Sequence, residues 1–599
     1  MSNTKLKKGV LPNNQAPITL AEFVYLGDGT NKTLTDNIKE NSNLLSDIVS
    51  KSINKQCPNC KTYKGVLELS ARGEFITNAR NTGVNGDFYL YDGKGLLVID
   101  GQEIAPGDYV YLEDGWFKPF RVVRNPEHKN TSYDVIIAGG GAGGIGAAYA
   151  LKDSGLKIAL VEKLDKLGGT HLNAGVSLRI ASPIGDWYKN ICKQAYEEGG
   201  MTFLNTSESV QIGEGSTFEK LWRGSQYCCS SYAGSHLNVD PYWFNEKYYK
   251  DLSTTIDIYL NTEIKEVISE TRKMQGIKTL NKISGIEKNI YAEYFIDCTG
   301  DGILCTYGKT EGTDYYLGSD SKDLFNEESI PSGYKGDRYS INTVELCYKT
   351  ATKNYKVGGL KIPVEDRTKW KTFNNVANNN NFGVTPPLGG ATIDSPSKHT
   401  GLSTKTFIDK GYDYTMHEAR LRDMAHYYVL TGEQQKNNPA SFIGGCDLLA
   451  IRESNRIKCD EMQTESDLYE RITSSNYIEK NTIALCCWYM DIHNDTFNIS
   501  SWNDRFGVPH GIKYQNIIPS AYDNVLVACR AFGCSHLAAS ASRLVKSMMS
   551  MGYAAGKAIQ QATDSWMEDV RNVDVAQLQV DIQIKNQIDE LETYFIDLL

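Results

Sequence analysis

The sequence has no apolar run that approaches the ~20 residues needed by a membrane-spanning helix. Its beginning, MSNTKLKKGVLPNNQ, carries a basic pair but no apolar core, so it does not predict a secretory signal. Basic residues are in the minority: 63 Lys and Arg stand against 73 Asp and Glu, a net charge of −10, which leaves no overall positive field to hold nucleic acid. We therefore expect cytoplasmic synthesis, no membrane span and no nucleic-acid partner.

A disulfide framework is also missing, because the 14 cysteines show no regular spacing. Cys57 and Cys60 form a lone C-x-x-C, with neither two further zinc ligands nearby nor a thioredoxin-like βαβ pattern around it. A structural turn, or a site completed by a symmetry-related copy, is favoured over zinc binding or redox activity. We expect no metal, and we expect the vicinal cysteines at 228–229 and 486–487 to be buried thiols.

Residues 133–170 carry the strongest pattern in the chain. The apolar run at 135–138 predicts a buried parallel strand, an alanine-rich run at about 145–152 predicts a helix that Gly155 ends, and 157–161 predicts a second strand. Glycines in G-x-G-x-x-G spacing separate the first strand from the helix, and an acidic residue follows the second strand. This order of elements predicts a dinucleotide site rather than a plain glycine-rich turn.

Each part of the motif has a physical role. Gly139 permits the tight turn, Gly141 lets backbone approach a pyrophosphate, and Gly144 allows close helix–strand packing. The helix N-terminus offers free N–H groups and about half a positive charge to the phosphates. Glu162, 21 residues beyond Gly141, can accept hydrogen bonds from a ribose hydroxyl.

Further segments carry a family resemblance. They are GGTHLNAGV at 168–176, FIDCTGDG at 295–302, IRESNRI at 451–457, DIH at 491–493 and NVLVACR at 524–530. In this order, over about 131–590, they resemble an FAD-dependent oxidoreductase family with the glutathione-reductase type of FAD fold. The resemblance implies FAD held by a doubly wound, Rossmann-like α/β domain with an inserted substrate domain. No second G-x-G-x-x-G with a following strand and acid appears, so no separate NAD(P)H domain is expected.

The resemblance also implies the residues of the site. Asp301 would contact the ribityl–phosphate part of FAD, Ile264 would supply backbone contacts to adenine, and His171 and Asn173 would lie near the flavin ring. A helix from Ser540 to Gly556 would aim its N-terminus at N1–C2=O of the flavin and stabilise negative charge there. The implied cofactor-binding residues are Gly139, Gly141, Ala142, Gly143, Gly144, Glu162, Lys163, Gly169, Thr170, Ile264, Thr299, Gly300, Asp301 and Arg530. The catalytic candidates are His171, Asn173, His493, Arg452 and Arg543.

Some of these assignments have a structural alternative. His493 suits a proton carrier because histidine titrates near neutrality, but each histidine can instead fill a hydrogen-bonded structural role. Arg452 and Arg456 either clamp an anionic substrate or form ion pairs with Glu453 or Glu461.

Two residues depart from the family pattern. Cys529 replaces the glycine of A-G-R, so a side chain occupies a place where backbone would pass close to the cofactor. Asn455 replaces an arginine of R-E-S-R-R. A family member that had lost catalysis would tolerate both changes, and neither argues against FAD binding.

The chain before the flavin segment has a different character. Apolar residues spaced three and four apart from Leu34 predict a short helix, either amphipathic and packed on its own chain or part of a coiled coil. Short runs at 88–91, 96–99 and 109–112, separated by Asp-Gly turns, predict a small all-β module. The predicted divisions are 1–56 (arm and helix), 57–125 (β-rich module), 131–310 (first part of the FAD domain), 311–450 (substrate or partner region), 451–570 (second part of the FAD domain) and 571–599 (helical tail).

Three functions are compatible with this organisation. The first is an FAD-binding oxidoreductase-like protein with an N-terminal attachment or oligomerisation module. The second is a structural or receptor-binding virion protein that keeps the flavoprotein fold without turnover, because the N-terminal part resembles phage tail-fibre modules. The third is a cytoplasmic flavoenzyme whose N-terminal part only drives oligomerisation. We expect a homo-oligomer, a trimer or a dimer, with virion proteins as partners if the chain is assembled into a phage particle.

Overall fold

The computed structural model divides into two compact units, Met1–Tyr133 and Asp134–Leu599. It describes six strands between residues 62 and 120, and then residues 132–595 except 175–177, 180–181, 227–234, 343, 347, 352–383, 386–403, 430–440 and 493–508.

The first unit contains short strands. β1 (Thr62–Leu67), β2 (Asp87–Tyr91), β5 (Tyr109–Glu113) and β6 (Trp116–Phe120) form a sheet in that order, parallel between β1 and β2 and antiparallel elsewhere. β3 (Leu97–Ile99) and β4 (Gln102–Ile104) form an antiparallel hairpin. The expected helix before residue 56 and the Cys57–Cys60 pair lie outside the described residues, so the all-β character of the whole module stays a prediction.

The second unit is built on a seven-stranded sheet. Its order is β12 (Asp257–Tyr259), β8 (Ile158–Val161), β7 (Ser132–Ala138), β15 (Glu287–Asp297), β14 (Lys273–Asn281) and β13 (Thr262–Glu270), and β25 (Val525–Val527) pairs with β15. β12, β8 and β7 run parallel to one another, as do β15 and β25. β8 and β25 are wholly buried, which fits the continuous apolar runs of parallel strands covered on both faces. The expected Rossmann-like α/β fold is therefore confirmed.

β15 belongs to two parts of this sheet. Its first half pairs antiparallel with β14, Tyr291 opposite Gly276, and so completes a meander with β13. Its second half pairs parallel with β25, Asp297 opposite Val527. The strand thus carries the chain from the meander into the centre of the sheet, and the turn that follows it lies beside the end of β7, where Cys298 N–H donates to the Ala138 carbonyl at 2.7 Å.

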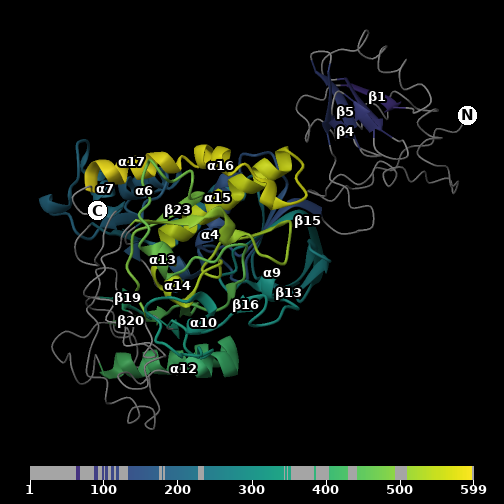
Figure 1. Ribbon diagram of the computed structural model, residues 1–599. Coiled ribbons are helices and arrows are strands. Elements are labelled where there is room, and N and C mark those ends of the chain that lie inside the picture. Colours follow the sequence, from purple (N-terminus) through teal and green to yellow (C-terminus); the bar gives the residue numbers. More distant parts are fainter. Residues whose placement is uncertain are drawn as a thin grey trace, which may run out of the picture. The chain divides into compact units, whose positions relative to one another are not determined.

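Two helices pack against each other so closely that their backbones are in contact. They are α4 (Ala142–Leu151) and α15 (Val545–Asp564), and Figure 1 shows them side by side. A side chain at Gly143 would collide with the Ala528 carbonyl, and one at Gly552 would collide with the Gly143 carbonyl. Because only glycine leaves room, α15 lies directly on the first turn of α4.

The expected single helix from Ser540 to Gly556 is wrong. α14 (His536–Ser542) ends at Arg543, and α15 begins after Leu544, whose backbone is extended at φ −66 and ψ 149. Arg543 therefore lies at the junction of two helices and not inside one. Because of this break, the Arg543 guanidinium lies in a different position from that of a side chain inside a continuous helix.

The other elements surround this core, with α16 and α17 along one side of the unit and α12 at the opposite side (Figure 1). α12 is interrupted at Gly411, whose φ is +80. Among the described residues, none of the helices has the length and apolar character to cross a bilayer. The remaining elements are α5 (Gly169–Asn173), β9 (Leu178–Arg179), α6 (Asp186–Glu198), β10 (Met201–Phe203), η3 (Glu208–Val210), α7 (Thr217–Gln226), β11 (Leu237–Val239), α8 (Pro241–Leu252), α9 (Ile303–Thr306), β16 (Tyr315–Tyr316), α10 (Lys322–Phe325), β17 (Val344–Glu345), β18 (Tyr348–Ala351), β19 (Val384–Thr385), α12 (Thr404–Val429), β20 (Ser441–Gly445), β21 (Ala450–Ile451), β22 (Arg456–Ile457), α13 (Glu465–Leu468), β23 (Thr482–Cys486), β24 (His510–Lys513), η5 (Tyr514–Ile517), η6 (Val570–Asn572), α16 (Val575–Asp581) and α17 (Ile584–Phe595).

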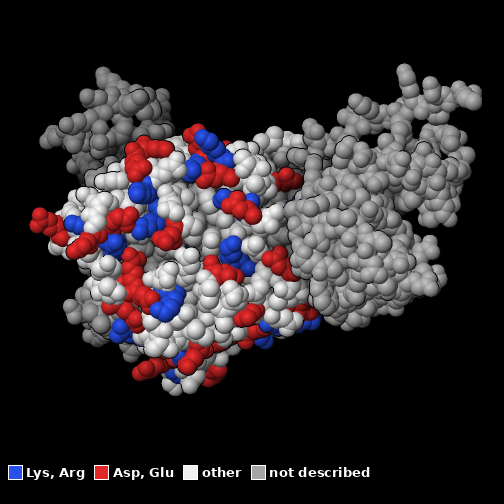
Figure 2. Space-filling model, turned by 90° about the horizontal axis from the view of Figure 1, so that it is seen from above, with Lys and Arg blue, Asp and Glu red and all other residues white. Residues whose placement is uncertain are grey.

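Charged side chains of both signs are interspersed over the described part of the face in Figure 2. The described part of the chain also contains exposed ion pairs, such as Lys585–Asp589 at 2.6 Å. Such exposed pairs contribute little to stability, usually below about 1 kcal/mol.

Candidate functional site

The glycine loop after β7 leaves space for a ligand at the start of α4. Gly139 has φ +96, and a side chain there would collide with the Cys298 carbonyl. At Gly141, by contrast, an added Cβ would meet no atom nearer than 3.9 Å. Gly141 is also the N-cap of α4 and no side chain caps the helix there. Open space in front of an uncapped helix N-terminus fits the two phosphates of a dinucleotide.

The G-G-T segment crosses this loop. Gly168 N–H donates to the Gly140 carbonyl at 2.8 Å, and an added Cβ on Gly169 would lie 2.8 Å from Gly141 Cα. Gly168, with φ +101, turns the chain into α5, which holds Thr170, His171 and Asn173. The two glycine motifs, 27 residues apart in the chain, therefore meet at the same point, and α5 borders the space in front of Gly141.

Glu162 closes the other end of the loop. Its carboxylate accepts hydrogen bonds from the Gly140 N–H at 2.8 Å and the Leu164 N–H at 2.9 Å. Burial raises its pKa, although these two N–H groups oppose the rise. Each carboxylate oxygen has two lone pairs, so Glu162 keeps acceptor capacity for a ribose hydroxyl. Its carbonyl accepts from the Thr262 N–H at 2.9 Å, which places β13 and Ile264 next to the same end.

The T-G-D-G turn after β15 forms a second side of the site. Thr299 donates its hydroxyl to Asp297 at 2.7 Å, and Gly300, with φ +83, lies against the Arg530 guanidinium. Asp301 accepts from Arg530 at 2.5 Å. Burial disfavours charge on Asp301, but the charges of Arg530 and Lys163 outweigh it and hold its pKa below the ordinary value. Asp301 is thus an anion whose side chain stays 26% exposed, at the edge of the loop region.

The two departures from the family pattern are accommodated in the protein interior. Asn455 Nδ2 donates to the Asp301 carbonyl at 3.0 Å and so helps to hold the turn. Cys529 is buried, and the N–H groups of Ala531 and Gly300 face its sulfur. Burial raises the pKa of this thiol to about 12, which keeps it protonated.

One segment, residues 447–457, joins the separate parts of the site. Asp447 N–H donates to the Asn173 carbonyl at 3.1 Å, and further along the segment Ser454 donates to Asp301 at 2.7 Å. Glu453, next to Ser454, lies against His536 at the start of α14. The segment therefore passes α5, the T-G-D-G turn at 299–302 and α14 in succession.

His171 and Asn173 lie on α5, and the contacts of Asn173 are structural. Asn173 donates to the Leu167 carbonyl at 2.9 Å and accepts from Asn245 at 3.3 Å. His171 is buried, with its ring centroid 6.2 Å from that of Tyr248. Asn173 thus shapes the loop, while the roles of both residues in catalysis stay predictions.

Arg452 and Arg543 lie close enough to influence each other. Arg543 donates to the Asp491 carbonyl at 2.8 Å and lies 3.5 Å from its carboxylate. Burial lowers the pKa of Arg543, and the positive charge of Arg452 adds to the effect, while Asp491 opposes it. His493 lies outside the described residues. Two cations and one acid therefore meet beside the helix junction.

Arg456 is not available to a substrate. Its side chain is fully buried and binds both carboxylate oxygens of Asp320, at 2.8 and 2.9 Å. Its Nε lies 3.1 Å from Glu453. Of the two alternatives for Arg456, a substrate clamp or an ion pair, the structure contains the ion pair with Glu453. Glu461 pairs with Lys513.

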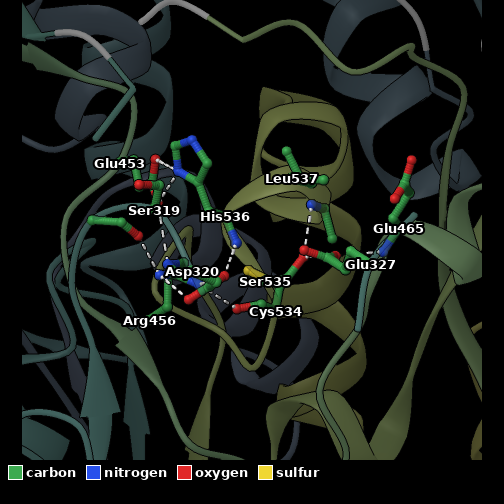
Figure 3. A network of polar contacts seen from close by, with 12 residues as sticks. Ser319, Asp320, Glu327, Glu453, Arg456, Glu465, Cys534, Ser535, His536 and Leu537 are labelled. Atoms are coloured by element: carbon green, nitrogen blue, oxygen red, sulfur yellow. Dashed lines mark hydrogen bonds and ion pairs between the residues drawn. The ribbon is translucent and has the colours of Figure 1, made fainter. Parts of the chain in front are cut away.

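The pair of His536 and Glu453 was missed by the sequence analysis. His536 Nδ1 lies 2.9 and 3.0 Å from the two carboxylate oxygens of Glu453, and both side chains are fully buried (Figure 3). Asn342 donates to the same carboxylate from its backbone and its side chain, each at 2.8 Å. Burial alone would raise the pKa of Glu453, but His536 and Arg456 hold it below the ordinary value. The available signal was a histidine that follows the NVLVACR segment at 524–530 by a few residues.

Among the described residues, no group of three or more His, Cys, Asp or Glu side chains is arranged to hold a metal ion. Cys486 and Cys487 are buried free thiols, as expected, and burial raises the pKa of Cys486 to about 12. Cys228 and Cys229 lie outside the described residues.

A βαβ unit with a glycine loop facing open space, a buried acid after its second strand and a β-meander defines a dinucleotide-binding protein of Rossmann-like fold. Over residues 134–582, more than half of its 599 residues, the sequence matches the family described as FAD dependent oxidoreductase. The chain belongs to this family, and FAD is its cofactor.

Similarity to individual proteins is local or distant. A dihydrolipoyl dehydrogenase of Bacillus subtilis (strain 168) is 58% identical over 45 residues, 8% of this chain and 9% of that enzyme. One of Trypanosoma brucei brucei is 56% identical over 43 residues, again 9% of that enzyme, so the chain spans about a tenth of the length of these curated relatives. Among solved structures, a geranylgeranyl bacteriochlorophyll reductase-like protein from Thermoplasma acidophilum is 11% identical. The match covers 77% of this chain and 84% of that protein, with a TM-score of 0.32. The flavin-dependent brominase Bmp2 is 11% identical, and the match covers 76% of this chain and 84% of the brominase, with a TM-score of 0.34.

Proposed function

We propose that the second unit is an FAD-dependent oxidoreductase whose substrate is oxidised or reduced beside His536, Arg452 and Arg543. The observation that carries this proposal is the adjacency of Ser454 and Glu453. Ser454 binds Asp301 at the cofactor turn, and Glu453 binds His536, so one dipeptide joins the FAD cradle to a buried histidine–carboxylate pair. Such a pair beside a cofactor suits proton transfer to or from a substrate.

The chain's own residues would hold the cofactor in three places. Residues 139–144 would bind the pyrophosphate through backbone N–H groups and the start of α4. Glu162 would accept from the ribose of the adenosine, with β13 alongside. Asp301, fixed by Arg530 and Ser454, would face the ribityl–phosphate part. When bound, FAD supplies the two-electron redox chemistry, and the protein supplies orientation and charge.

The polar residues around the helix junction would act on the substrate. Glu453 fixes the orientation of the His536 ring through Nδ1, so that the ring can exchange a proton at its other nitrogen. Arg543 and Arg452 bring positive charge to the same side, which would attract an anionic group on the substrate. Asp491 holds Arg543 in place through its backbone carbonyl.

The absorption spectrum of the purified protein tests this proposal first. Flavin bands that remain after gel filtration, and that appear in the supernatant as FAD after acid release, are expected. A screen of small anionic substrates under anaerobic conditions then follows bleaching of the flavin bands. A colourless protein that also takes up no added FAD would refute the proposal.

The N-terminal unit is proposed to serve in oligomerisation or attachment. Its support is the predicted helix after Leu34 and the separate contacts of Met1–Tyr133. The molar mass of the full chain in solution, measured by light scattering, tests this: a dimer or trimer is expected, and a monomer would refute oligomerisation. The alternative of a virion protein stays a prediction from the sequence, because neither the described residues nor the family supports it.

A further inference from the structure

Glu327 is a buried acid that the proposed chemistry does not use. It follows α10, is 4% exposed, and faces α13 and the start of α14 (Figure 3). One carboxyl oxygen accepts hydrogen bonds from the Glu465 N–H, at 2.8 Å, and from the Ser535 hydroxyl. The other oxygen, Oε2, is buried and has no hydrogen-bond partner among the residues that the structure describes. A carboxylate oxygen left bare in the interior costs more free energy than a neutral carboxyl group in the same place.

The charges around Glu327 also disfavour its ionisation. Two other buried acids face Glu327. They are Asp320, which precedes α10, and Glu465, on α13. Arg456 on β22 is bound to Asp320, and the Lys322 ammonium binds the backbone carbonyl of Glu327. His536 on α14 is turned to Glu453. Burial raises the pKa of Glu327 to about 7, and the two neighbouring acids add to the rise.

Glu327 and Asp320 hold adjacent residues at the start of α14. The Ser535 hydroxyl donates to Glu327 and accepts from the Ala538 N–H at 3.1 Å, which makes it the N-cap of α14. The next residue, His536, donates its backbone N–H to Asp320 at 2.7 Å. Because like charges repel, a negative charge on Glu327 would act against Asp320 and so against the anchor of His536.

We propose that Glu327 is a positioning residue of the flavin site, whose uncharged form holds Ser535 and the start of α14 so that His536 stays on Glu453. Loss of the Glu327 proton loosens this arrangement and changes the surroundings of the flavin. The inference rests on the proposed function, since it gives Glu327 a role only through His536.

Two measurements test this proposal, one that follows bound FAD and one that follows the Glu327 carboxyl group. Absorption spectra of the FAD-loaded protein, recorded between about pH 5.5 and pH 8.5, are expected to show a transition near neutrality. Glu327→Gln, which keeps the shape and stays neutral, should lose that transition and keep the low-pH spectrum. Glu465→Gln, a matched change at the neighbouring buried acid, should retain it. Asp297, whose pKa burial raises to about 6, is present in all variants, so only the component removed by Glu327→Gln is assigned to Glu327.

Infrared difference spectra of the FAD-free protein over the same pH range separate this inference from the proposed function. A carboxylic-acid band that disappears as the pH rises, and that is missing in Glu327→Gln, shows that Glu327 titrates whether or not FAD binds. Ser535→Ala should keep this band but lose the transition of the flavin, because it breaks the hydrogen bond that links Glu327 to α14. This variant also tests the proposal if Glu327→Gln does not fold. A flavin transition that persists in Glu327→Gln or in Ser535→Ala, or a wild-type protein without either signal, would overturn the proposal.

Discussion

The glycine loop at 139–144 and the charged network around Arg456 are built on opposite principles. The loop consists of glycines and backbone N–H groups from one continuous βαβ unit, and its function depends on side chains that are absent. The network consists of full-length charged side chains, and its members, Asp320, Glu453, Arg456 and His536, come from segments up to 216 residues apart. The comparison teaches that the glycine loop depends on local backbone geometry, whereas the charged network depends on long-range electrostatics.

The largest effect is expected where the glycine loop meets the backbone that follows β25. Gly143→Val places a side chain against the Ala528 carbonyl, so two backbones must separate. We expect a loss of about 5 kcal/mol or more in the free energy of unfolding, enough to prevent accumulation of folded protein. Soluble yield and circular dichroism measure it.

Gly155→Asn is the control for this change. Gly155 has φ +78, which asparagine tolerates, and an added Cβ meets nothing within 4 Å. A Gly143→Val protein as stable as Gly155→Asn would contradict the close approach of α4 to the Ala528 backbone.

The charged network is tested by Arg456→Met. The substitution leaves Asp320 and Glu453 buried without their shared cation. Removing one partner of such a buried pair typically costs about 3–5 kcal/mol. Urea unfolding of the FAD-free protein measures the loss. Lys585→Met, which removes an exposed pair with Asp589, should cost below about 1 kcal/mol, and equal losses at both positions would argue that the network is not structural.

The pH dependence of stability tests the acid beside the network. The pKa of Glu327 is raised from 4.5 to about 7 in the folded protein, so its stabilising contribution is complete below about pH 4.5 and is lost as the pH rises through 7. Relative to Glu327→Gln, the wild type should therefore lose up to about 3 kcal/mol between about pH 4.5 and pH 8. Denaturant midpoints at several pH values measure this difference, and parallel pH profiles would show that Glu327 does not titrate in this range.

The smallest effect on stability, but a specific one on binding, is expected at the mouth of the loop. Gly141→Ala adds a Cβ that meets no protein atom nearer than 3.9 Å, so the fold should be unaffected. The same Cβ occupies the space proposed for the pyrophosphate, and we expect FAD affinity to fall at least about tenfold, or about 1.4 kcal/mol. Fluorescence titration with FAD measures it. Unchanged affinity would place the pyrophosphate elsewhere.

The sequence by itself determined the parts whose physical causes are local. The spacing of Gly139, Gly141 and Gly144 between two apolar strands predicts the βαβ unit because turn, helix start and acid all lie within about 30 residues. The apolar run of β7 predicts a buried strand, the run of β8 predicts a second strand, and the family motifs predict FAD. These features depend on backbone conformation and side-chain size at neighbouring positions.

Only the tertiary structure decided which charged residues are buried and paired with one another. Arg456 and Arg452 look equivalent in the sequence, but Asp320, 136 residues away from Arg456, takes Arg456 into the interior. The helix break at Arg543 depends on where α14 and α15 pack, and the pairing of His536 with Glu453 joins residues 83 apart. Buried charges are placed by the requirement that each finds a partner, and a linear pattern does not show which partner folding brings within reach.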